Sequence, residues 1–149
     1  MSGGLAVYWH ENCVVKIVDK DARHIDAVVR IHEGVSQWRI TFVYGEPRVE
    51  NRHLMWTKLQ NLKTVSNLTW LVIGDFNEAM WDFEHFSATP RAAAQMLAFR
   101  DVLETCELVD LVFSRARFTY DNRRNGMGNV RVRLDQAVAT SSWRYMFAF

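Results

Sequence analysis

The sequence predicts an α/β layered domain, because segments with the two-residue period of strands outnumber those with the period of helices. Short segments rich in β-branched and aromatic residues fill the first third of the chain, and two later segments repeat apolar residues at helical spacing. At 149 residues, the chain can bury roughly 70% of the surface that its unfolded form exposes, enough for one core. We therefore expect a single domain, residues 1–149.

The first half of the chain predicts a meander of four antiparallel strands followed by a helix. The strand segments are residues 5–9, 13–18, 23–32 and 37–44. Pro47 can occupy the first turn of a helix, and Met55, Leu59 and Leu62 then recur at helical spacing to about residue 63. This helix would return the chain to the sheet.

The second half predicts one more core strand, a second helix and shorter strands. Residues 68–73 are a strand of core type, and an alanine-rich stretch after Pro90 carries the apolar stripe of a helix. The stripe consists of Met96, Phe99, Leu103 and Cys106. Further strands are expected at 109–113, 117–120 and 129–139, with a Gly/Asn-rich turn at 121–128.

Polar side chains follow the core strand where it ends, in the sequence Gly74-Asp75-Phe76-Asn77. Carboxyl ends of strands in α/β sheets open onto ligand crevices. On an extended backbone Asp75 and Asn77 would project together while Phe76 turns into the core, and the two could bind Mg²⁺ or orient a water. An Asx turn that merely ends the strand is the commoner alternative.

Composition restricts the partners and the compartment. The chain is 49% hydrophobic and 23% charged, with a net charge of +1, as in globular proteins. No window reaches the ~18 apolar residues of a membrane span, so no membrane partner is expected. Cys13 and Cys106 form no disulfide or zinc pattern, and the N-terminus has no signal-peptide pattern. We expect an intracellular protein, nuclear or cytoplasmic and not secreted, without an obligate protein partner.

Arginines concentrate in one late segment, where Asp121 is the single acid. They are Arg115, Arg117, Arg123, Arg124, Arg131 and Arg133, with Phe118 and Tyr120 between them. Such a segment could track a phosphate backbone and stack bases, or could be a solvated hairpin face. An opposite group of acids follows the core strand and suits either a divalent cation or plain solvation: Asp75, Glu78, Asp82 and Glu84.

Seven blocks in order resemble the endonuclease/exonuclease/phosphatase superfamily of DNase I-like fold, most closely the endonuclease domain of plant LINE-type non-LTR retrotransposon polyproteins. The blocks are GGLAVYW (3–9), HIDAVV (24–29), WRITFVYGEP (38–47), WLVIGDFNEAM (70–80), FRDVLETCELVDLVF (99–113), FTYDNRRNG (118–126) and VRLDQAVA (132–139). The resemblance implies a partial DNase I-like layered sandwich of mixed, largely antiparallel sheets flanked by helices.

The resemblance also implies residue roles in metal-dependent cleavage of DNA by an activated water. Asp75 matches the aspartate that orients or deprotonates the water, and Asn77 its partner in holding water, phosphate and the cation, Mg²⁺ or Mn²⁺. Tyr44 matches a tyrosine at the scissile phosphate, although by itself it would be a strand-end aromatic. Asp135 matches the aspartate that holds the catalytic histidine.

The sequence departs from the family pattern at both ends, which implies an incomplete domain over 1–149 that is weakly active or inactive as isolated. A metal-binding Glu and an Asn expected upstream, and a Ser-Asp-His segment expected downstream, are missing. Tyr120 and Gln136 stand where the family usually has Trp and Arg. None of the five histidines lies in the catalytic place: His10, His24, His32, His53 and His85.

Two alternatives to a DNA endonuclease remain. One is a non-catalytic nucleic-acid binder that uses Arg123, Arg124, Arg131, Arg133 and Tyr120. The other, within the superfamily, is an enzyme acting on a small phosphoester such as a phosphoinositide or sphingomyelin. A protein kinase is excluded, because its Asp-Phe-Gly motif would need glycine where Asn77 stands and a glycine-rich loop before it.

Overall fold

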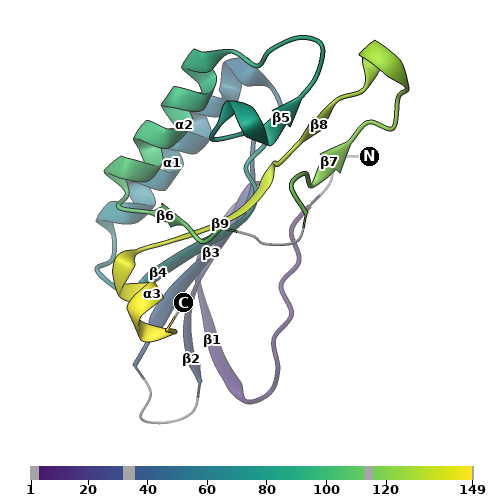
Figure 1. Cartoon of the computed structure of the whole chain (residues 1–149). Helices are drawn as coiled ribbons and strands as arrows, with labels where there is room; N and C mark the ends of the chain where they lie inside the picture. The colour runs from purple at the N-terminus through teal and green to yellow at the C-terminus, as the bar shows by residue number, and fades with distance from the viewer. Residues whose placement is uncertain (1–3, 32–35, 113–115, 149) are drawn as a thin grey trace.

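The computed structural model describes residues 4–31, 36–112 and 116–148 and contains a mixed six-stranded sheet (Figure 1). β3 and β4 are parallel, and every other neighbouring pair is antiparallel, so the expected mixed, largely antiparallel sheet is confirmed. In spatial order the strands are β1 (Cys13–Lys20), β2 (His24–Ile31), β3 (Trp38–Tyr44), β4 (Trp70–Asp75), β9 (Asp135–Ala139) and β6 (Val109–Asp110).

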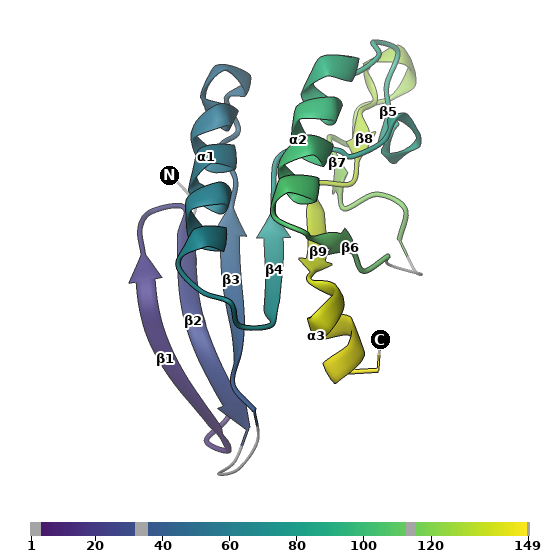
Figure 2. The same ribbon diagram turned by 90° about the vertical axis from the view of Figure 1, so that its left-hand side faces the viewer.

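Two helices, α1 (Arg52–Thr64) and α2 (Ala93–Thr105), cover one face of this sheet (Figure 2). α1 lies in the connection between β3 and β4, as parallel neighbours require a crossover. The largest fully buried apolar side chains fill the layer between sheet and helices: Leu59, Trp70, Phe76 and Phe99. Both expected helices are present, and their apolar side chains pack against those of β4 and of Phe76, which follows it.

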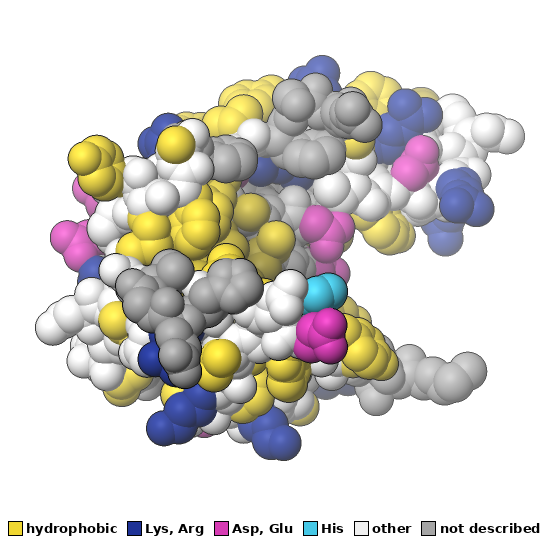
Figure 3. Space-filling view, turned by 90° about the horizontal axis from the view of Figure 1, so that it is seen from below, with side chains coloured by type: hydrophobic (Ala, Val, Ile, Leu, Met, Phe, Trp, Pro, Cys, Tyr) yellow, Lys and Arg dark blue, Asp and Glu magenta, His cyan; other side chains and the backbone are white. Residues whose placement is uncertain are grey.

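The opposite face of the sheet is only partly covered, by the short helix α3 (Ser141–Met146). The rings of Trp143 and Trp38 meet edge to face with centroids 6.2 Å apart. Farther along β4, Ile73 remains exposed. Seen from below, hydrophobic side chains gather near the middle of the molecule (Figure 3). This face therefore retains uncovered apolar surface.

A small three-stranded sheet lies at the end of the molecule toward which β3 and β4 run (Figure 1). It consists of β5 (His85–Phe86), β8 (Arg131–Val132) and β7 (Tyr120–Asp121). The described residues also form three short 3₁₀ turns: η1 (Val49–Asn51), η2 (Asp82–Glu84) and η3 (Gly126–Gly128).

Several predicted boundaries are wrong. Residues 5–9 form no strand, and α1 begins at Arg52, after η1 and not at Pro47. The expected strand 129–139 is broken between β8 and β9, because the Arg133 amide donates to Glu84 O (2.9 Å) and the Leu134 amide to Thr119 Oγ1 (2.9 Å). The helix α3 and the strand β5 were not predicted. His32, Phe113 and Arg115, which belong to predicted segments, lie outside the described residues.

Candidate functional site

Three of the four predicted catalytic residues are aligned across neighbouring strands. Tyr44 at the end of β3 pairs in register with Asp75 at the end of β4, and Asp75 pairs with Asp135 at the start of β9. Directly opposed residues on neighbouring strands project from the same side of a sheet. A phenol and two carboxylates thus gather at one edge, where the sheet ladder stops.

Asn77 reaches this edge through a turn and not along an extended strand. Its amide donates to Asp75 Oδ1 (2.7 Å) and its φ is +55°, which is an Asx turn. Phe76 between them is fully buried, as expected. The expectation of an extended backbone from Asp75 to Asn77 is therefore wrong, and the turn instead holds the Asp75 carboxylate on the Asn77 backbone amide.

The turn is fastened to the neighbouring strand end. The Asn77 side-chain amide donates to the Gly45 carbonyl (2.8 Å), and the Gly45 amide donates to the Asp75 carbonyl (2.5 Å). A Cβ on Gly45 would lie 2.5 Å from Phe76 O, so only glycine permits this approach. These hydrogen bonds join the loop that follows Tyr44 to the turn that follows Asp75.

Electrostatics make Asp75 the most perturbed carboxyl group of the site. Burial raises its pKa, the hydrogen bond from the Asn77 amide lowers it, the charge of Asp135 raises it again, and Arg52 lowers it. A carboxylate with a raised pKa is a better proton acceptor. The nearby charge of Asp135 also means that a cation placed between the two groups would relieve their repulsion.

The oxygens at this edge fit a hard divalent cation. Asn77 uses its amide nitrogen on Gly45, which leaves its side-chain oxygen available, and among the described residues none donates to Asp75 Oδ2. Carboxylate and amide oxygens are the ligands that Mg²⁺ takes in proteins. The set is small, since the part of the chain that the structure describes contains no group of three or more His, Cys, Asp or Glu able to hold a metal.

Of the other acids after β4, Asp82 is exposed, as plain solvation predicts, but Glu78 and Glu84 are structural, so the expectation of cation binding or solvation is wrong for these two. Glu78 is fully buried and paired with Arg52 and Arg91. Glu84 is buried too, and its carboxylate accepts from the Met80 amide (2.7 Å). Neither carboxylate is exposed to bind a cation from solvent.

Two of the arginines predicted to bind nucleic acid are engaged in ion pairs. The guanidinium of Arg133 bonds Asp110 (2.8 Å) and Glu84 (2.7 Å), and its side chain is 11% exposed. Those carboxylates raise the pKa of Arg133. Arg131 contacts Asp121 at 3.1 Å but remains half exposed. Arg133 is thus a structural residue, which the density of arginines in the sequence did not indicate.

Arg123, Arg124 and Tyr120 are exposed, as a nucleic-acid surface requires. They lie on the β7–β8 hairpin, whose tip is ordered by Asn122 and Asn129. Neither Arg123 nor Arg124 forms an ion pair within the described residues. The basic surface that remains is therefore the hairpin tip.

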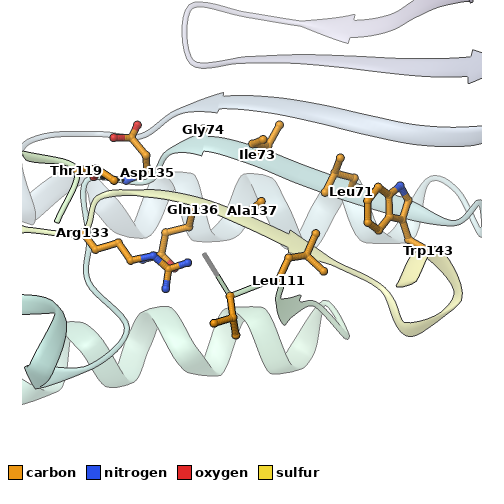
Figure 4. Close-up of a pocket in the computed structure, with 11 residues that line it drawn as sticks. Leu71, Ile73, Gly74, Leu111, Thr119, Arg133, Asp135, Gln136, Ala137 and Trp143 are labelled. Carbon is orange, nitrogen blue, oxygen red and sulfur yellow. Dashed lines mark hydrogen bonds between the residues drawn. The ribbon is translucent and has the colours of Figure 1, made fainter. Parts of the chain in front are cut away.

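A groove of about 540 Å³ adjoins the site on the uncovered face of the sheet (Figure 4). Leu71, Ile73, Leu111 and Ala137 supply its apolar walls. Asp135 lies at one end, on the side of the β9 ribbon opposite to Gln136. The candidate site thus opens beside an apolar surface.

Among the described residues, no histidine forms a hydrogen bond with Tyr44, Asp75 or Asp135. His24, in β2, is fully buried with Nε2 3.0 Å from Asp19 Oδ2 and Nδ1 2.9 Å from Asp21 Oδ1. Asp135 accepts no hydrogen bond from a histidine in the described ranges. Within those ranges, no helix is long and apolar enough to cross a membrane.

A comparison with known protein families gives a match over nearly the whole chain. The family model described as Endonuclease/Exonuclease/phosphatase family matches residues 1–146. A search of curated proteins found no match.

Among solved structures, the chain is similar to the endonuclease domain of TRAS1, a telomere-specific non-LTR retrotransposon (17% identity, TM-score 0.66, covering 90% of this chain and 58% of that one). It is also similar to the AP endonuclease LMAP from Leishmania major (19% identity, TM-score 0.62, 83% and 47% covered). A third is beta toxin from Staphylococcus aureus (10% identity, TM-score 0.56, 80% and 44% covered). These likenesses show the DNase I-like fold, and the chain spans about half of each neighbour's length.

Proposed function

Because the chain belongs to the endonuclease/exonuclease/phosphatase family, we propose that it carries a phosphodiesterase site for DNA that uses a divalent cation, Mg²⁺ or Mn²⁺. The observation that carries this proposal is the alignment of Tyr44, Asp75 and Asp135 across three strand ends. A bound cation would supply charge stabilisation for the pentacovalent phosphate. The oxygens of Asp75 and Asn77 would hold it.

Each residue then has a role that its geometry supports. Asp75, whose pKa is raised by burial, accepts the proton of the attacking water. Asn77 is fixed by its bond to Gly45 and directs its side-chain oxygen to the cation. Tyr44 presents its hydroxyl to a phosphate oxygen, and Asp135 would hold the ring of a catalytic histidine, as the matching aspartate of the family does.

Turnover in the isolated chain is proposed to be weak or absent. The described residues offer two cation ligands at the site and no histidine beside Asp135. Each group that stabilises a transition state contributes several kcal/mol, so the lack of both a third ligand and an acid/base partner lowers the rate by orders of magnitude.

Binding of Mn²⁺ tests the proposal independently of turnover. We expect Mn²⁺ to broaden the NMR signals of Asp75, Asn77 and Tyr44 before those of other residues, and Asp75→Ala to abolish this effect. Nicking of supercoiled plasmid with Mg²⁺, compared with Asp75→Ala, then measures the rate. Equal broadening in the chain and in the variant would refute the site.

A second candidate function is non-catalytic nucleic-acid binding, favoured by the exposed Arg123, Arg124 and Tyr120 on the β7–β8 hairpin. Cations bind phosphates and an exposed aromatic ring stacks on bases. Retention on DNA that falls with salt, and that persists in Asp75→Ala, is the expected result. Absence of retention at low salt would exclude this function.

A further inference from the structure

A fully buried carboxylate, Glu78, binds two arginines that come from different elements. Arg52 Nη1 donates to Glu78 Oε2 from the first turn of α1, and Arg91 Nε donates to Glu78 Oε1 from the segment before α2. Glu78 itself is 0% exposed. Taking these three charges largely out of solvent costs free energy that their pairing offsets, and such buried ion pairs can fix one conformation.

Other donors of both arginines bind backbone carbonyls next to the proposed catalytic residues. Arg52 donates to Glu46 O (3.2 Å) and to Pro47 O (3.1 Å), in the loop that follows Tyr44. Arg91 Nη2 donates to Asn77 O (3.0 Å). Each guanidinium thus links Glu78 to one of the two loops of the site.

The same network reaches the third strand. The Gln136 side-chain amide, from β9, donates to the Glu78 carbonyl (3.3 Å). The ends of β3, β4 and β9 therefore share Glu78 as a common centre. Asn77, held at φ +55°, is the member whose conformation a non-glycine residue seldom adopts without support.

We propose that Arg52 and Arg91, bridged by Glu78, are positioning residues that hold Asn77 and the loop after Tyr44 in the geometry of the site. The inference rests on the proposed function, because it assigns Asn77 and Tyr44 to catalysis. Both arginine side chains are largely buried and act through the carbonyls they bind. Arginine is suited to this because its fork donates to a carboxylate and a carbonyl together, which the single ammonium group of lysine does not reproduce.

Hydrogen exchange at Asn77, measured without metal, tests the proposal. Arg91→Lys keeps a cation beside Glu78 but removes the fork, and we expect about tenfold faster exchange of the Asn77 amide, the effect of losing roughly one hydrogen bond. The matched control is Arg100→Lys, since Arg100 also bonds a carbonyl, Met80 O, and packs on Trp81, away from the site. The control should leave Asn77 exchange unchanged.

A second variant covers the case in which Arg91→Lys does not fold. Arg52→Lys should accelerate exchange of the Gly45 amide, which donates to Asp75 O, relative to Arg100→Lys. Unchanged exchange at Asn77 in Arg91→Lys, or equal acceleration in Arg91→Lys and the control, overturns the positioning role.

Failure of this inference and failure of the proposed function are separable. The exchange rates require no cation, whereas Mn²⁺ broadening at Asp75 tests the site alone. Faster exchange at Asn77 in Arg91→Lys with no Mn²⁺ effect in the unmodified chain would leave the network established and remove the catalytic assignment. With Mn²⁺ bound, Arg91→Lys should also show weaker broadening at Asn77.

Discussion

The strand-end site and the β7–β8 hairpin are both rich in polar side chains, yet only at the strand ends does a short motif identify a polar pair that the structure holds together. Asp75 binds the Asn77 amide two residues later, and sheet register places Tyr44 and Asp135 beside it. In the hairpin segment, Arg133 is neutralised by Asp110 and Glu84, 23 and 49 residues away. The local motif therefore predicts the pair Asp75 and Asn77 but not Tyr44 and Asp135, which the family resemblance identified, and a count of arginines does not predict which cations are free.

The largest expected effect distinguishes the buried arginine of the hairpin segment from the exposed ones. Arg133→Leu leaves the Glu84 and Asp110 carboxylates without their cation and should cost about 3–5 kcal/mol of the free energy of unfolding. Urea denaturation measures it, with Arg123→Leu as the matched control. If Arg133→Leu lowered the free energy of unfolding no more than Arg123→Leu does, Arg133 would not be structural and would again be a candidate for binding nucleic acid.

A smaller effect is expected where the two site loops touch. Gly45→Ala places a Cβ 2.5 Å from Phe76 O and should lower the free energy of unfolding by about 1–3 kcal/mol. Gly128→Ala is the control, because its Cβ would meet only Arg124 side-chain atoms at 3.8 Å. Equal stability of the two variants would show that the loops after β3 and β4 are not held together as described.

Asp75→Asn should stabilise the fold at neutral pH, because burial raises the pKa of Asp75 above its value in the unfolded chain. The folded state then binds the proton more tightly than the unfolded state does. The ionised carboxylate therefore destabilises the fold above the pKa of the folded state, and this effect vanishes below the pKa of the unfolded state. We expect Asp75→Asn to be more stable than the unmodified chain at pH 7, by a margin that shrinks toward pH 4.

The side-chain carbonyl that Asp75→Asn introduces can still accept the hydrogen bond from the Asn77 amide, so the turn is retained. Thermal melts at several pH values measure the gain, and Asp101→Asn on the exposed side of α2 is the control. A loss of stability at pH 7 in Asp75→Asn would contradict a raised pKa for the Asp75 carboxyl group.

The smallest change in stability is expected at the hairpin tip. Replacement of Arg123 and Arg124 by alanine should alter the free energy of unfolding by less than about 0.5 kcal/mol, because both are exposed and without ion pairs in the described chain. Their loss should instead weaken salt-dependent retention on DNA, lowering the slope against log salt by about 2. Retention equal to that of the unmodified chain would remove this surface from nucleic-acid binding.

The positions of much of the sheet and of both long helices followed from periodicity, and α2 buries its predicted stripe. Burial in the strands follows the apolar pattern less closely, since β1 buries none of its residues and β3 buries Arg39, Thr41 and Val43. The strand expected at residues 5–9 failed because strand propensity depends on a paired neighbour, which these residues lack within the described chain. The break between β8 and β9 depends on Glu84 and Thr119, which no local pattern identifies.

Within the site, Asp75 and Asn77 were found from the chemistry of a polar pair after a core strand, and the Asx turn was the commoner structural alternative for that pair. The role of Glu78 was missed, because the acids after β4 look alike in sequence and only the fold brings Arg52 and Arg91 to one of them. The pairing of an arginine in the first turn of a helix with an acid far away in the sequence leaves no pattern in residue spacing, so the sequence alone does not reveal it.

The Mn²⁺ titration followed by NMR tests the central claim most directly, because it asks where the chain binds a divalent cation and not how fast it turns over. We predict that broadening begins at Asp75 and Asn77, extends to Tyr44 and Asp135, and disappears in Asp75→Ala. Broadening that begins elsewhere, for example at Asp121 of the hairpin, and that survives in Asp75→Ala would contradict the claim.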